Sequence, residues 1–109
     1  GYRLAVLSNN DSRLRPVLSD LGVSGLFEEL FISSEIGFEK PSPEIFQEVE
    51  RILGTTPKDM FHLGDSYSRD VQGALSAGWH TALYSEKASA SPENISRIES
   101  FRELLDLLP

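Results

Sequence analysis

Five polar residues carry the chemistry that this sequence offers: Ser8, Asn9, Lys40, Asp65 and Asp70. The first two follow an apolar block, and Asp65 follows another apolar block that ends in glycine. Together the five supply a hydroxyl, an amide, an ammonium group and two carboxylates. Mg²⁺ prefers one or two carboxylates together with water and phosphate oxygens. The sequence therefore predicts a site that holds a phosphate group beside Mg²⁺.

The elements that must position these residues are short strands alternating with helices. Strands are predicted over residues 4–7 (buried), 29–32, 60–63 and 81–84, with a short edge strand within 95–98. Helices are predicted over 14–21, from Pro43 to Leu53, from Tyr67 to about Gly78 and over about 101–108, with loops over 33–40 and 85–94.

This alternation indicates right-handed crossovers and parallel strands. The predicted class is α/β, a three-layer Rossmann-like parallel sheet with helices on both faces, in a single domain over residues 1–109. Ligands of such folds bind at the carboxyl ends of the strands, where Ser8, Asn9 and Asp65 would lie. Asp70 reaches the same edge if a helix begins near Ser68.

Each of these residues also has a purely structural interpretation. The polar run that begins at Ser8 is typical of a helix-capping turn, and Lys40 is typical of a solvated loop charge. Asp65 could cap the next helix, and Asp70 is a favourable charge near a helix start. His62 is interpreted as a packed strand residue. Only the order of the polar residues at successive strand ends favours a binding site.

The composition and net charge of the chain disfavour several classes of partner and location. The chain has 109 residues, 39% of them hydrophobic, no cysteine and a net charge of −7. The negative charge disfavours nucleic acid and anionic membrane surfaces as partners. The longest apolar run, residues 4–7, is too short to cross a bilayer, and the start of the chain lacks the form of a signal peptide. A cytoplasmic location is expected, and the absence of cysteine suits it.

Three ordered motifs occur at these predicted strand ends. The first is residues 7–10 (LSNN), the second is residues 37–46 with the form G-x-x-K-P-x-P-x-I-F, and the third is residues 62–70 (HLGDSYSRD). Together with residues 73–79 (GALSAGW), they closely resemble motifs II, III and IV of the haloacid dehalogenase-like hydrolase superfamily, in the subfamily I branch. The resemblance covers nearly the whole chain.

The resemblance implies a role for each candidate residue. The Ser8 hydroxyl and the backbone amide of Asn9 would hold the transferring phosphoryl group, and Lys40, the one catalytic residue expected here, would neutralise its charge. Asp65 would bind Mg²⁺, and Asp70 would bind or orient the metal. The implied partner is a small phosphorylated substrate, and the implied cofactor is Mg²⁺.

The family's motif I is not in this sequence. That motif, a strand ending in D-x-D, supplies the aspartate nucleophile and the general acid, and no D-x-D occurs in the 109 residues. The chain thus resembles the carboxy-terminal portion of the core, and the motif I strand and the cap domain are expected upstream of Gly1 or in another chain.

Two functions follow from this pattern. One is the phosphate- and magnesium-binding portion of a phosphomonoester hydrolase that acts through an aspartyl-phosphate, with the nucleophile outside the chain. The alternative is a non-catalytic module, or a fragment that complements another chain, so whether this chain is an enzyme stays open. A serine esterase centred on Ser66 is disfavoured because Ala77, not an aspartate, stands three residues before His80.

Overall fold

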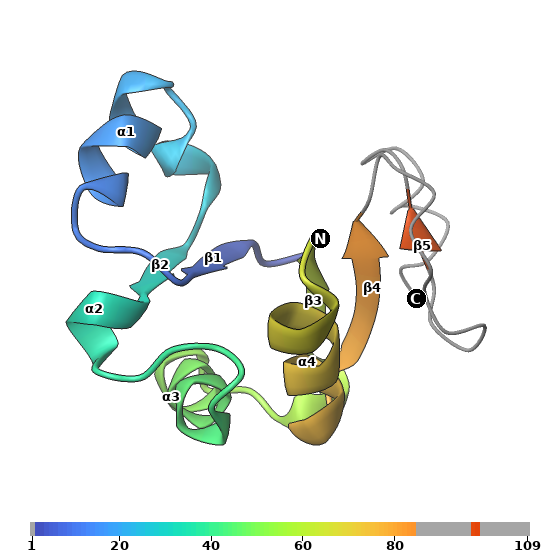
Figure 1. The fold of residues 1–109 in the computed structure, drawn as a ribbon. Coiled ribbons are helices and arrows are strands. Elements are labelled where there is room, and N and C mark those ends of the chain that lie inside the picture. The colour runs from blue at the N-terminus through green and yellow to red at the C-terminus, as the bar shows by residue number, and fades with distance from the viewer. Residues whose placement is uncertain (1, 85–96, 99–109) are drawn as a thin grey trace.

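The computed structural model describes residues 2–84 and 97–98. These residues form five strands: β1 (Ala5–Ser8), β2 (Glu29–Ile32), β3 (Phe61–Gly64), β4 (His80–Tyr84) and β5 (Arg97–Ile98). The α-helices are α1 (Leu14–Asp20), α2 (Ser33–Ile36), α3 (Pro43–Leu53) and α4 (Gly73–Ser76) (Figure 1). Short 3-10 helices span Ser24–Leu26 and Pro57–Asp59, and a π-helical segment spans Tyr67–Gln72.

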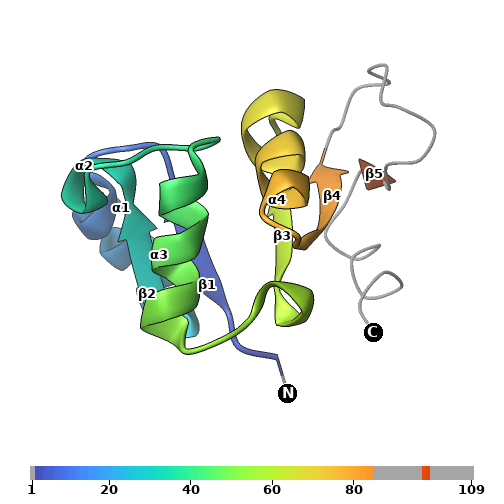
Figure 2. The same ribbon diagram turned by 90° about the horizontal axis from the view of Figure 1, so that it is seen from below.

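All strand pairs are parallel, which confirms the α/β prediction. They form two sheets within the described part of the chain, β1–β2 and β3–β4–β5, instead of one continuous sheet. Figure 1 shows α1 and α3 on opposite sides of the β1–β2 pair, and Figure 2 shows α3 and α4 side by side. The edges of β1 and β3 are not hydrogen-bonded to each other.

Most element boundaries follow local chemistry. Helix α3 begins at Pro43, whose fixed φ suits the first helical position, and ends before Gly54, which adopts a left-handed φ of 66°. Residues 33–40, predicted as a loop, contain the single turn α2 instead, closed by Gly37 at φ 94°. The predicted loop over 85–94 and the predicted helix over 101–108 lie outside the described residues.

The amino-terminal part of the chain is less buried than its sequence predicts. The prediction of a buried first strand is wrong, because Ala5 is exposed and the rest of β1 is only half-buried. Helix α1 has no buried residue: its apolar Val17 is 51% exposed, and Leu21, directly after the helix, is 68% exposed. The physical reason is that, among the described residues, β1 has a neighbouring strand on one edge alone.

The core lies where α3 meets α4 and the two sheets. Its buried members are Phe31, Ile45, Phe46, Val49, Ala74 and Trp79. The rings of Phe46 and Trp79 pack edge to face with centroids 5.0 Å apart, a favoured aromatic geometry. A Cβ on Gly73 would lie 2.9 Å from the Phe46 ring, so glycine lets α4 approach α3 closely. No described helix has both the length and the apolarity to cross a membrane.

We expect Phe46→Ala to lower the free energy of unfolding by about 3–5 kcal/mol, because it removes a fully buried aromatic ring and leaves a cavity. Ile52→Ala is the matched control on the same helix. Ile52 is 44% exposed, so we expect its truncation to cost less than about 1 kcal/mol. Urea unfolding monitored by circular dichroism measures both. Equal losses in the two variants would contradict the position of the core.

Candidate functional site

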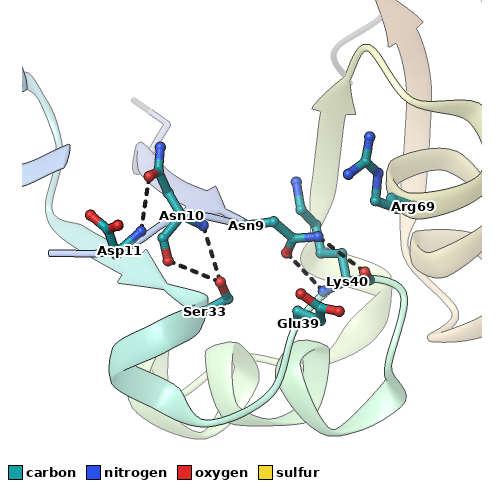
Figure 3. Close-up of a pocket in the computed structure, with 7 residues that line it drawn as sticks. All are labelled: Asn9, Asn10, Asp11, Ser33, Glu39, Lys40 and Arg69. Carbon is teal, nitrogen blue, oxygen red and sulfur yellow. Dashed lines mark hydrogen bonds between the residues drawn. The ribbon is translucent and has the colours of Figure 1, made fainter. Parts of the chain in front are cut away.

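The five predicted site residues lie together at the carboxyl ends of β1 and β3. They line a cavity of about 180 Å³, whose walls are formed by Ser8, Asn9, Lys40, Asp65, Ser66, Arg69 and Asp70. A second cavity of about 450 Å³ shares three of these residues with the first. Its walls are Asn9, Asn10, Asp11, Ser33, Glu39, Lys40 and Arg69 (Figure 3).

Asn9 fastens the loop that carries Lys40. The Asn9 side chain donates from Nδ2 to the Lys40 carbonyl oxygen at 3.1 Å and accepts from the Lys40 backbone amide at Oδ1 at 2.9 Å (Figure 3). Both polar atoms of this amide are thereby occupied. Asn9 contributes only side-chain atoms to this clamp, so the contact is compatible with a phosphate-binding role for the Asn9 backbone amide.

Lys40 is held with its charge almost out of water. Its side chain is 11% exposed, and its Nζ donates to the Leu7 carbonyl oxygen at 3.2 Å and to Asp70 Oδ1 at 2.5 Å. An ammonium group has three donors, and these two contacts use two of them. The third is left for a ligand in the cavity that Lys40 lines.

Asp70 is the most buried charged group of the site, at 3% exposure. Its Oδ1 also lies 3.0 Å from His62 Nε2, and its Oδ2 accepts from the Ser66 backbone amide at 3.0 Å. Burial alone would raise the pKa of Asp70, but the hydrogen bond from His62 and the hydrogen bond and charge of Lys40 hold that pKa well below its ordinary value. Asp70 is therefore an ionised group that fixes the Lys40 ammonium.

His62 and Gly64 are site residues that the sequence interpretation missed. His62 packs against Phe46 as a core residue does, but its ring also faces Asp70. A Cβ on Gly64 would lie 2.1 Å from Asp70 Cγ, so this position must be glycine for the carboxylate to fit. The alternation of side chains along a strand could have indicated their shared role, since His62 and Gly64 are two residues apart and lie on the same face of β3.

Asp65 differs from Asp70 in being exposed. No hydrogen bond or ion pair of its carboxylate is found within the described residues. Across residues 2–84 and 97–98, no three His, Asp or Glu side chains gather as a metal site. One or two carboxylates are nevertheless enough for Mg²⁺ when phosphate and water complete the shell. Asp65 fits a direct ligand, whereas both oxygens of Asp70 already face internal donors.

Ser66 begins the segment that carries Asp70. Its Oγ accepts from the backbone amide of Arg69 at 3.2 Å, the side-chain contact that opens the π-helical segment. This cap fixes the turn between β3 and Asp70, and Arg69 lines both cavities. Arg69 is a site residue that the sequence motifs did not predict.

Comparison with known proteins identifies relatives of this chain. The family model described as haloacid dehalogenase-like hydrolase matches residues 1–78. The chain is 36% identical to the human haloacid dehalogenase-like hydrolase domain-containing protein 3, over 100% of this chain and 45% of that protein. It is also 36% identical to a glyceraldehyde 3-phosphate phosphatase of Methanopyrus kandleri, over 99% of this chain and 50% of that protein.

A solved structure has the same fold. The magnesium-bound putative HAD-hydrolase of Bacillus subtilis matches with a TM-score of 0.88 and 28% identity, over 97% of this chain and 49% of that one. The chain thus spans about half the length of the relatives that it matches.

We expect Gly64→Ala to destabilise the chain by about 1–3 kcal/mol, because the added methyl group overlaps the Asp70 carboxylate and forces it away. Gly25→Ala is the control, since no atom lies within 4 Å of a Cβ at that position. Thermal unfolding of the two variants tests this close approach. A Gly64→Ala variant as stable as the parent chain would contradict it.

Asp70→Ala should cost about 3–5 kcal/mol of stability, because it leaves the Lys40 ammonium buried without an opposite charge. The double variant Asp70→Ala with Lys40→Met removes the orphaned charge as well. We expect it to recover part of the loss, and a double-mutant cycle by urea unfolding measures the coupling. Strictly additive effects would show that the two groups do not interact in solution.

Proposed function

The chain belongs to the haloacid dehalogenase-like hydrolase family, and from this premise we propose that it is the phosphate- and magnesium-binding portion of a phosphomonoester hydrolase. The observation that carries the proposal is the Lys40 ammonium, fixed between the Leu7 carbonyl and Asp70 beside a cavity that Ser8 and Asp65 also line. In this function Lys40 and Ser8 bind the phosphoryl oxygens, and the backbone amide of Asn9 assists them.

Charge balance supports a phosphate together with a cation. Lys40 and Arg69 oppose Asp65 and Asp70 around the smaller cavity, so these four side chains sum to zero. A phosphoryl dianion would then meet the unpaired Asp65 carboxylate, and at ~4 Å and an effective dielectric near 20 each such repulsion is about 4 kcal/mol. Mg²⁺ bound by Asp65 would offset that repulsion and neutralise phosphoryl oxygens. The magnesium in the Bacillus subtilis relative agrees with this assignment.

The edges of β1 and β3 that have no strand partner among the described residues are the place we propose for the missing catalytic strand. A strand ending in D-x-D would pair with both edges, complete a three-layer Rossmann-like sheet and bring a carboxylate to the cavity. That carboxylate would attack phosphorus and release the leaving-group oxygen, which a second aspartate would protonate. Water would then hydrolyse the aspartyl-phosphate. The relative named as a glyceraldehyde 3-phosphate phosphatase supports small phosphate esters as the substrate class.

The chain alone should not turn over a small aryl phosphate in excess Mg²⁺, because positioning without a nucleophile leaves the bond-breaking step unassisted. Adding in trans a segment that carries the D-x-D strand, taken from a relative, should restore activity, measured as release of the aryl alcohol. Turnover by the lone chain that is lost when one of its own residues is replaced would overturn the proposal.

In the complemented complex, Asp65→Asn should lower Mg²⁺-dependent activity and raise the Mg²⁺ concentration needed for half-maximal rate. Asp20→Asn removes the same charge from an exposed position on α1, away from both cavities, and should change neither quantity. An unchanged Mg²⁺ dependence in the Asp65 variant would contradict the metal assignment alone and leave the phosphate assignment standing.

A further inference from the structure

Arg69 has no carboxylate partner, unlike four other arginines of the described chain. Each of those four lies within 4 Å of an acidic side chain: Arg3 with Glu28, Arg13 with Asp11, Arg15 with Glu35, and Arg51 with Glu48. Arg69 is exposed, and the one contact of its guanidinium among the described residues is a 3.4 Å hydrogen bond from Nε to Ser66 Oγ. In a chain of net charge −7, a cation left unpaired beside a binding site is available to an anionic ligand.

The position of Arg69 is fixed by its neighbours. Its backbone amide is tied to Ser66 Oγ, and the next residue, Asp70, is buried and hydrogen-bonded on both oxygens. Figure 3 shows its side chain on the wall of the larger cavity that lies across from Asn10 and Asp11. The Arg69 side chain therefore lines this cavity from a backbone position that these hydrogen bonds hold in place.

The two cavities differ in what they offer a ligand. Ser8, Asp65 and Asp70 line the smaller cavity and are absent from the walls of the larger one. Arg69 lines both, so it lies where the transferred phosphoryl group would meet the rest of the substrate. Lys40 also lines both, but its ammonium is turned to Leu7 and Asp70.

The other charges of the larger cavity do not neutralise Arg69. Asp11 is paired with Arg13 at 2.6 Å. Glu39 is exposed and lies outside ion-pair distance of any cation in the described chain. An acidic side chain of this kind accepts hydrogen bonds from hydroxyl groups. The larger cavity thus presents a guanidinium that has no carboxylate partner among the described residues, together with acceptors for hydroxyl groups.

We propose that Arg69 is a specificity residue that binds a second anionic group, a carboxylate or a second phosphate, on the leaving portion of a hydroxylated phosphate ester. The guanidinium matches such groups in a bidentate manner, which an ammonium does not. This assignment rests on the proposed function, because it places the transferred phosphate in the smaller cavity. It adds the substrate class: acidic, hydroxylated phosphate esters.

Three ligands distinguish the proposed phosphate site from the proposed role of Arg69. Each is titrated into the labelled chain in the presence of Mg²⁺, and binding is followed by NMR. Inorganic phosphate reports the smaller cavity alone. Glycerol 3-phosphate and 3-phosphoglycerate share a carbon skeleton, but only the second carries a carboxylate. We expect 3-phosphoglycerate to bind about tenfold more tightly than glycerol 3-phosphate, the factor expected of one charge-assisted contact.

Arg69→Gln should abolish this preference, and its loss of affinity should be much larger for 3-phosphoglycerate than for inorganic phosphate, although Arg69 also lines the smaller cavity. Arg51→Gln removes the same charge from α3, away from both cavities, and should preserve the preference. A preference that persists in Arg69→Gln overturns the proposal, as does an equal weakening of all three ligands, which would assign Arg69 to the transferred phosphate.

Failure of the underlying function gives a different result. If the unaltered chain binds no inorganic phosphate, the phosphate site itself is wrong, and the role of Arg69 is overturned with it. If the chain binds inorganic phosphate but does not distinguish the two esters, only the specificity role of Arg69 is overturned.

Discussion

The buried ion pair of Lys40 and Asp70 is the interaction on which the rest of the site depends. Its two side chains are 11% and 4% exposed, so neither charge is stabilised by water to any extent. Each is acceptable only because the other is present and because neighbouring groups fill its remaining hydrogen bonds. The Leu7 carbonyl does this for Lys40, and His62 with the Ser66 amide does it for Asp70. The pair therefore imposes a position on each of its neighbours.

That requirement also links the two sheets. Leu7 belongs to β1, whereas His62 belongs to β3, and these strands share no backbone hydrogen bond. The loop after α2 brings Lys40 between them, and the side chain of Asn9 clamps its backbone. On the other side, α3 and α4 join the sheets through apolar packing around Phe46. A polar contact at the strand ends and an apolar core thus connect two sheets whose described strands β1 and β3 do not pair.

The sequence predicted the parts of this arrangement that are encoded locally. Strand β2 has its predicted bounds because its residues favour strands, and helix α3 has its predicted bounds because a proline begins it and a glycine follows it. The five candidate site residues line one cavity as expected, since parallel strands bring their carboxyl ends together. The missed features depend on contacts across the fold. Neither the hydrogen bond of His62 to Asp70 nor the exposure of α1 is visible in local periodicity, because tertiary partners decide both.

Paired and unpaired charges divide the site into two kinds of residue. Lys40 and Asp70 each have partners that fix the position of their charged groups, so a ligand must bind to them in these positions. Asp65 and Arg69, by contrast, stand exposed at the same cavity without an ion-pair partner among the described residues. Two opposite charges that flank one cavity without pairing lose the modest stabilisation that a surface ion pair gives. Leaving both unpaired is reasonable if each has its own ligand, a cation at Asp65 and an anion at Arg69. In the function proposed above, the buried pair would set the geometry of the phosphate site, and Asp65 and Arg69 would each add a ligand of opposite charge.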